Sequence, residues 1–257
     1  NGGALALPGS LMPPGPLGSA LLRYIIDRQV QPGERLPTIP ELSVELGVSV
    51  GKVREELEVA RTLGLVQIKP RTGSVVQPFD FTPAATLGVL YAIGLDPAYF
   101  HTFADLRKHL ELSYWTEAVA CLTPDDIDTL RALNARAVEK LNRLPIEVPV
   151  EEHARLHLTF YRHLENTFVQ GLLSAYWAAY MAFGVALHAP LTYHREMWTY
   201  HEQMVECVAR GDYEGGRRAL REHMELLRHA PETIEQGARR VIETDAKAYR
   251  YIFSVFE

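Results

Sequence analysis

The sequence is poor in cysteine and has no excess of positive charge. Only two of its 257 residues are cysteine, Cys121 and Cys207, and they form no CxxC pair, which argues against a disulfide scaffold and fits a reducing cytosol. Lys and Arg number 26 against 32 Asp and Glu, so a protein that coats nucleic acid through bulk positive charge is excluded. The chain also lacks H-E-x-x-H, G-x-S-x-G and a phosphate-binding glycine loop, and we therefore do not expect an enzyme.

Two stretches carry no charged side chain. Residues 1–17 are broken by proline and glycine and lack the basic start of a signal peptide, so we expect a disordered or tag-derived N-terminus. The 29 residues from Asn166 to His194 are long enough to cross a membrane. Gln170, Pro190 and the absence of a flanking Lys/Arg cluster instead favour a helix buried at the centre of a bundle. We therefore expect a cytoplasmic protein with no membrane partner.

Residues 18–78 are predicted to form a small module of three helices and a β-hairpin. Apolar residues recur at helical spacing over 18–30, Thr38 and Glu41 form a capping box for a second helix, and Ser49 is a suitable N-cap for a third. The segment LVQIKPRTGSVVQ then has the pattern of two short strands around a Pro/Gly turn.

This module has the signals of a winged helix–turn–helix that binds DNA. Gly47 permits the tight turn between the second and third helices, because positive φ is cheap for glycine. The start of the third helix can then enter a major groove with Val50, Gly51, Lys52 and Arg54. The hairpin can lie along the phosphates or in the minor groove with Lys69, Arg71 and Thr72. A winged helix that serves protein contacts is the alternative.

Beyond a linker at 79–95, the rest of the chain is predicted to be helical. The fold class is therefore mainly α, with a winged helix–turn–helix followed by an all-α antiparallel helical bundle over 96–230. The expected helices of this part are 84–94, 97–121, 124–143, 150–165, 167–189, 192–210, 213–229 and 232–253. A C-terminal helical extension, 231–257, has an apolar face that needs a partner, either a second subunit or the linker; this face contains Tyr249, Ile252, Phe253 and Phe256.

Four of the ten histidines have a spacing that suggests a metal site. His153 and His157 are four residues apart and so share one face of a helix. His201 and His223 lie on two later helices among apolar residues, and histidines that converge inside a bundle can bind a transition metal. The remaining six have no such pattern, although His194 precedes His201 by seven residues and would share its face on one continuous helix.

The segment PGERLPTIPELSVELGVSVGKVREELEVARTLGLVQIKPRTGSVV closely resembles the winged helix of the GntR family of bacterial transcriptional regulators. The resemblance implies a homodimer that binds operator DNA, with DNA contacts at Arg35, Thr38, Ser49, Lys52, Arg54, Arg71, Thr72 and Gly73. Members commonly have arginine where this chain has Val50, which cannot make a bidentate contact to guanine. We therefore expect an operator other than the commonest one.

From about 105 to 230 the chain resembles the FCD domain of the FadR-type subfamily, an all-helical ligand-binding domain. The resemblance rests on DLRKHLELSYWTEAVACLTPDD, HARLH and YHEQMVECVARGDYEGGRRALREHMELL. In metal-binding members one Asp and three His hold a divalent cation, and the matching positions here are His153, His157, His201 and His223. His153 replaces the Asp, and four neutral imidazoles favour zinc or nickel over magnesium or calcium.

These features predict a regulator whose DNA affinity is controlled by a small organic acid at the metal site. The carboxylate would fill an open coordination position and also meet Arg107, unless Arg107 pairs instead with Glu111 four residues later. One alternative is a metal-free apolar pocket for an acyl chain, lined by Tyr176, Trp177, Tyr180 and Phe183. Another is a metal-dependent hydrolase.

Overall fold

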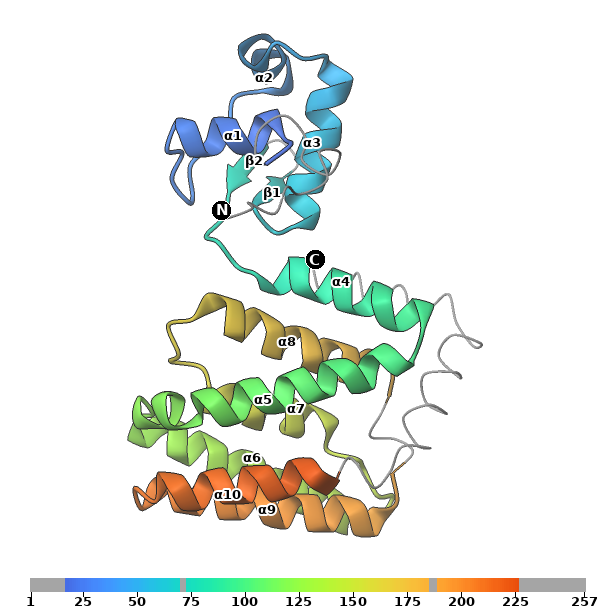
Figure 1. Ribbon diagram of the computed structural model, residues 1–257, viewed down its shortest axis with the longest axis vertical. Coiled ribbons are helices and arrows are strands. Elements are labelled where there is room, and N and C mark those ends of the chain that lie inside the picture. Colours follow the sequence, from blue (N-terminus) through green and yellow to red (C-terminus); the bar gives the residue numbers. More distant parts are fainter. Residues whose placement is uncertain (1–16, 70–72, 185–188, 227–257) are drawn as a thin grey trace, which may run out of the picture. The chain divides into compact units, whose positions relative to one another are not determined.

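The computed structural model describes residues 17–69, 73–184 and 189–226, and the chain divides into two units, Asn1–Ala84 and Ala85–Glu257 (Figure 1). The first unit has the predicted order of three helices and a hairpin. Its elements are α1 (Ala20–Asp27), α2 (Ile39–Leu46), α3 (Val50–Thr62), β1 (Val66–Lys69) and β2 (Gly73–Val76). The strands pair antiparallel, with Val66 opposite Val76 and Lys69 opposite Gly73.

Local signals set the ends of α2 and α3. The Glu41 carboxylate accepts hydrogen bonds from both the backbone N–H and the hydroxyl of Thr38, at 2.8 and 2.7 Å. Gly47 ends α2 in the left-handed region, with φ at 65°, and the Ser49 hydroxyl accepts a bond from the Lys52 N–H at the start of α3. The predicted tight turn between two helices is therefore present.

One apolar face of α3 forms the centre of the first unit. Val53, Leu57 and Ala60 are buried there with side chains from α1, α2 and the hairpin. The carboxylate of Glu56 is also buried here. It accepts hydrogen bonds from the Ser19 hydroxyl at 2.9 Å and from the Leu21 N–H at 2.7 Å. Glu56 thus satisfies one of the free N–H groups at the start of α1 and holds that helix against α3.

The described part of the second unit is an all-α bundle, as predicted. Helix α9 packs against α6 and α10, α5 packs against α10 and α8, and α7 packs against α6 and α8. The first of its helices, α4, occupies most of the range expected to be a linker. The helices are α4 (Thr82–Leu95), α5 (Ala98–Ala120), α6 (Pro124–Asn142), α7 (Val150–Phe160), α8 (Thr167–Ala182), α9 (Leu191–Ala209) and α10 (Tyr213–Leu226).

Two helices are shorter than their apolar patterns predict. Helix α7 ends at Phe160 rather than at 165, because a turn follows and the Asn166 side chain then caps the next helix. Helix α8 ends at Ala182 rather than at 189, and Gly184 with φ of 58° lies just beyond it. The expected helix 232–253 lies outside the described residues.

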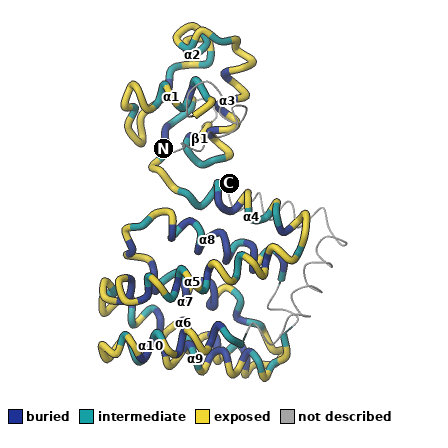
Figure 2. The backbone as a smooth tube through the Cα atoms, in the orientation of Figure 1, coloured by how far each residue is buried: buried dark blue, intermediate teal, exposed yellow. Residues whose placement is uncertain are grey.

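The uncharged helix α8 is buried, as its sequence predicted. Eight of its 16 residues are buried, and Figure 2 shows it in dark blue alternating with teal within the bundle. Trp177 and Tyr180 are almost fully buried, and they pack with Phe100 of α5 and Ile93 of α4. No helix among the described residues combines the length and apolar character that a membrane crossing requires.

Helix α10 approaches α5 closely through a glycine. A Cβ added to Gly216 would lie 2.8 Å from Cζ2 of Trp115, so any larger residue would push the helices apart. The Trp115 indole N–H donates to the carbonyl of Tyr213 at 2.8 Å and fixes the start of α10 on α5. His223 lies two turns after Gly216 on nearly the same face of α10, so this contact also sets where His223 enters the core.

Asp126 connects the start of α6 to the turn after α7. One carboxylate oxygen accepts from the Thr123 backbone N–H and hydroxyl and from His163, and the other accepts from Arg162 at 2.8 Å. Burial opposes ionisation of this carboxyl, but the bonds from Thr123 and His163 outweigh it and hold the pKa of Asp126 well below its usual range. The charged form of Asp126 therefore stabilises the folded chain.

We expect Asp126→Asn to lower the free energy of unfolding at pH 7 by about 1–2 kcal/mol, because the neutral amide loses charge-assisted bonds. Because the pKa of Asp126 is lower in the folded chain than in the unfolded chain, its ionisation stabilises the fold above the unfolded-state pKa of about 4. This stabilisation is lost as the pH falls below that value. Denaturant unfolding of the two proteins at pH 7 and again below pH 4 measures the difference in the free energy of unfolding. Asp128→Asn, at an exposed position on the same helix, is the control, and equal losses in the two variants would contradict this role.

Candidate functional site

The four histidines singled out by their spacing converge in the core of the second unit. His153 and His157 come from α7, His201 from α9 and His223 from α10. Their side chains are at most 2% exposed, and one ring nitrogen of each lies within 4.8 Å of those of the others. The structure thus brings together residues separated by as many as 70 positions in the sequence.

The ring nitrogens in this cluster lack the hydrogen bonds that buried nitrogens normally make. His153 Nε2, His201 Nδ1 and both ring nitrogens of His223 have no partner among the described residues. Nε2 of His157 and Nε2 of His201 lie 3.2 Å apart. Two nitrogens on one tetrahedral ion with 2.0–2.1 Å bonds would be about 3.3 Å apart, so this pair has the spacing of two ligands.

The histidines are held in their neutral form. Burial lowers the pKa of His153, His201 and His223 well below its usual value, and the neighbouring rings and the Arg107 cation lower it further. Burial also lowers the pKa of His157, against the opposing effect of Glu111. Neutral imidazole is the form that coordinates a metal ion.

A buried carboxylate orients one of these rings. Glu111 on α5 is inaccessible, and its Oε2 lies 2.8 Å from Nδ1 of His157. The Arg107 guanidinium lowers the pKa of Glu111 despite burial, so Glu111 can only accept, and we assign the proton to His157 Nδ1. Nη2 of Arg107 also lies 3.0 Å from Nδ1 but finds no acceptor there once Nδ1 carries the proton. The lone pair on Nε2 of His157 therefore faces the other histidines.

Arg107 is buried and already paired. Its Nε donates to Glu111 Oε1 at 2.5 Å, which is the four-residue pairing that the sequence allowed. The guanidinium lies over the rings of Tyr176 and Trp177, 4.3 and 4.5 Å from their centroids, and is 2% exposed. Arg107 and Glu111 therefore form a nearly neutral pair beside the histidines.

Aromatic residues enclose the cluster. Trp177 packs on His153 and His157 with ring centroids 4.5 and 5.0 Å away, and Trp198 packs on His201 at 4.6 Å. The indole N–H of each tryptophan is buried without a partner among the described residues. Trp177 was predicted only as a lining residue of the alternative apolar pocket. The role of Glu111 towards His157 and the packing of Trp198 on His201 were not predicted, because both depend on contacts that periodicity along the sequence does not reveal.

In the described part of the chain, the histidines outside the pattern do not join the cluster; His188 and His229 lie outside that part. His194 does lie on the same helix as His201, and it is buried, but it is not part of the four-residue group. His163 bonds to Asp126, and Nδ1 of His109 lies 2.8 Å from the carbonyl of Asp105 on the exposed side of α5.

The proposed DNA-binding residues lie on the surface of the first unit. Arg35, Ser49 and Arg54 are exposed, and neither arginine has an ion-pair partner among the described residues of the chain. Lys52 is half exposed and lies near Glu55 and Glu56, at 3.5 and 3.9 Å.

The remaining predicted DNA contacts have mixed positions. The Thr38 hydroxyl is used as a helix cap, and Arg35 forms an isolated bridge to Val75 of the hairpin. Gly73 begins β2 with φ of 83°, while Arg71 and Thr72 lie outside the described residues. An exposed, unpaired Arg54 near the start of α3 is thus the clearest candidate for a base contact.

Comparison with known proteins agrees with the division of the chain into an N-terminal winged-helix unit and a C-terminal helical unit. Residues 17–76 match the model of the bacterial regulatory proteins of the gntR family, and residues 102–226 match that of the FCD domain. The HTH-type transcriptional regulator Rv1152 of Mycobacterium tuberculosis is 32% identical over 91 residues, which cover 31% of this chain and 75% of that protein.

A solved structure shares the fold. Streptococcus agalactiae GntR superposes with a TM-score of 0.60 at 16% sequence identity, over 82% of this chain and 96% of that one. The matching families are transcriptional regulators and not enzymes. With its winged helix–turn–helix and its FCD domain of FadR-type architecture, the chain belongs to the GntR family of bacterial DNA-binding transcriptional regulators.

Proposed function

We propose that this regulator binds a divalent transition metal through His153, His157, His201 and His223, and that a small carboxylate effector at this site controls its affinity for operator DNA. The observation that carries the proposal is the convergence of four buried, neutral histidines, four of whose eight ring nitrogens have no hydrogen-bond partner among the described residues. Buried polar atoms without hydrogen bonds are costly, and coordination would satisfy them.

The donor set favours zinc or nickel. All four ligands are imidazoles without charge, whereas magnesium and calcium prefer oxygen ligands that carry negative charge. Glu152, in the first turn of α7, is 3% exposed and pairs with Lys140 at 3.1 Å. It therefore serves the contact between α6 and α7 rather than the metal site.

The charge balance at the site favours an anionic effector. Arg107 and Glu111 neutralise each other, and the four histidines are neutral. A bound divalent cation would add two positive charges in a dry interior and would bind the carboxylate as a Lewis acid. Arg107, close to His157, would add a hydrogen-bond donor for the same carboxylate.

The aromatic enclosure supports a second candidate, an apolar effector without metal. Trp177, Tyr180 and Phe183 are buried in one cluster on and just after α8, and an acyl chain would pack against such side chains. The metal content of the protein separates the two candidates.

Regulation requires that effector binding reaches the DNA-binding unit. We propose a homodimer, in which two winged helices contact half-sites at a fixed separation. An effector that bridges α7, α9 and α10 would change the separation at which the dimer holds its two winged helices. Such coupling is typically about 1–3 kcal/mol and is reciprocal, so operator DNA would change effector affinity by the same factor.

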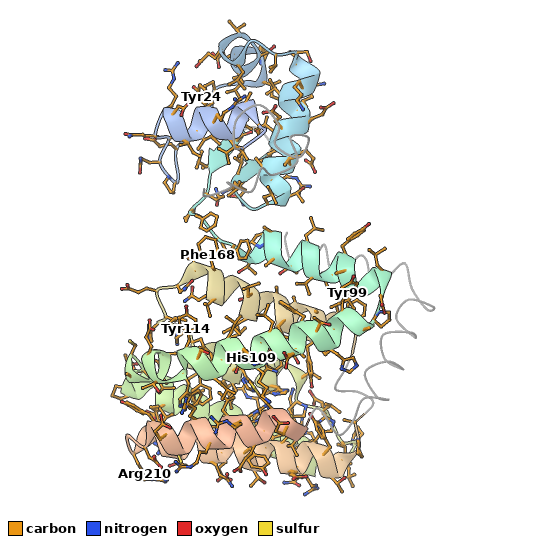
Figure 3. The ribbon with its side chains drawn as sticks, in the orientation of Figure 1. Tyr24, Tyr99, His109, Tyr114, Phe168 and Arg210 are labelled. Carbon is orange, nitrogen blue, oxygen red and sulfur yellow. The ribbon has the colours of Figure 1, made fainter. Side chains whose placement is uncertain are left out.

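We expect protein purified without a histidine tag to contain about one zinc or nickel ion per chain, by elemental mass spectrometry before and after dialysis against chelator. His201→Ala should lower this content at least tenfold, because it removes a central ligand. His109→Ala is the control, since His109 projects from the exposed side of α5 (Figure 3). Metal far below one equivalent in unaltered, folded protein would contradict the proposal.

We expect Glu111→Gln to weaken metal affinity about 10–100-fold, the usual effect of losing a carboxylate that orients a ligating histidine. Competition with a chromophoric chelator gives the affinity, and circular dichroism checks that the variant is folded. Glu117→Gln on the exposed side of α5 is the matched control. Unchanged affinity in folded Glu111→Gln would show that Glu111 does not orient His157.

We expect Arg54→Ala to weaken binding to the DNA upstream of the protein's own gene about 5- to 150-fold, because one base contact is worth about 1–3 kcal/mol. Fluorescence anisotropy at fixed salt gives the affinity. Arg61→Ala is the control, since Arg61 lies two turns further along the same face of α3 and pairs with Glu58. Equal losses in the two variants would argue against α3 as the recognition helix.

A further inference from the structure

Helix α4 presents an apolar face that no described residue covers. Its 14 residues include no charged side chain, and one side packs into the bundle through Ala85 and Ile93. On the opposite side Leu87, Tyr91 and Leu95 follow one another at four-residue spacing and are 42%, 68% and 67% exposed. Surface helices normally carry polar residues on such a face, so this one indicates an interface.

The apolar face continues onto α5 and has room for large side chains. Tyr99, at the end of α5 that follows α4, is 51% exposed, and Figure 3 shows it at this corner of the bundle. A Cβ added to Gly88 or Gly94 of α4 would meet no atom within 4 Å. A second helix could therefore lie close to the α4 backbone.

The last described residues of the chain lie within reach of this face. Helix α10 ends at Leu226, and the preceding residue, Glu225, forms an ion pair with Lys108 of α5. From Lys108 to Tyr99 is about 14 Å along the helix, and α4 adds about 21 Å. The 31 residues 227–257 would span about 46 Å as a helix, which is enough to run along α5 and then α4.

The sequence of this segment complements the exposed face. Ile242, Ala246, Tyr249, Phe253 and Phe256 recur at alternating spacings of four and three residues, which places them on one side of a helix. Charged residues such as Lys247 fall on the other side. Large aromatic side chains would fill the space beside the α4 glycines, and a tethered segment reaches its site at an effective concentration in the millimolar range.

We propose that residues 231–257 of the same chain form a helix that covers the face of α4 made by Leu87, Tyr91 and Leu95. The segment lies beyond the residues that match the FCD domain, so it would be an addition of this chain to that domain. Because α4 lies directly after the winged helix in the sequence, the segment would enclose the helix that joins the two functional units. This inference does not depend on the metal or the effector.

Disulfide trapping in the full chain tests the proposal. In a background of Cys121→Ser and Cys207→Ser, Tyr91→Cys is combined with Phe253→Cys or, as the matched control, with Lys247→Cys. Mild oxidation should link the Phe253→Cys pair within one chain at least tenfold faster than the control pair. Non-reducing electrophoresis separates links within a chain from links between chains, and mass spectrometry identifies the joined peptides.

A link between chains would overturn the proposal and indicate that a second copy covers α4. Equal rates in the two pairs, or no link in a chain that is folded by circular dichroism, would also overturn it. A second measurement uses Phe253→Ser with Phe256→Ser, which should expose α4 and raise the fluorescence of a bound hydrophobic dye several-fold. Unchanged fluorescence relative to Lys247→Ser with Arg250→Ser would count against the proposal.

Discussion

The burial of four neutral histidines at one point is the constraint on which the second unit depends. Each ring removes polar nitrogens from water, and four of the eight find no partner among the described residues. The cluster requires that α7, α9 and α10 converge, and Gly216 against Trp115 allows α10 to pack closely on α5. The helices of the bundle are packed around a polar centre rather than around a purely apolar one.

The pair of Arg107 and Glu111 links this centre to the rest of α5. Separating two such buried charges would leave one of them uncompensated, which is strongly unfavourable, so the pair is held together. Glu111 then sets the tautomer of His157, while Arg107 rests on the aromatic rings of α8. A ligand that contacted either residue would therefore act on side chains of α5, α7 and α8 at once. This property suits a sensor domain.

The first unit depends on a different balance. Its residues 1–80 carry eight basic and eight acidic side chains, so affinity for DNA cannot come from overall charge. The ammonium group of Lys52 lies 3.5 Å from Glu55 and 3.9 Å from Glu56, which also accepts a hydrogen bond from the start of α1. Arg35 and Arg54 have no ion-pair partner among the described residues, so their charges are available to a DNA backbone or base.

Much of the fold could be read from the sequence because its signals are local. The turn at Gly47, the cap at Ser49 and the shared face of His153 and His157 each involve residues within a few positions of one another, and the structure contains all three. The ends of α7 and α8 were predicted too far along the chain, because buried apolar residues continue beyond the last helical residue at Tyr161, Leu164 and Phe183. Only the tertiary structure decided that His201 and His223 meet α7, that Glu111 orients His157, and that Arg107 is enclosed. Those contacts depend on how distant helices pack, and periodicity within a single helix carries no information about the rotation or depth of its neighbours.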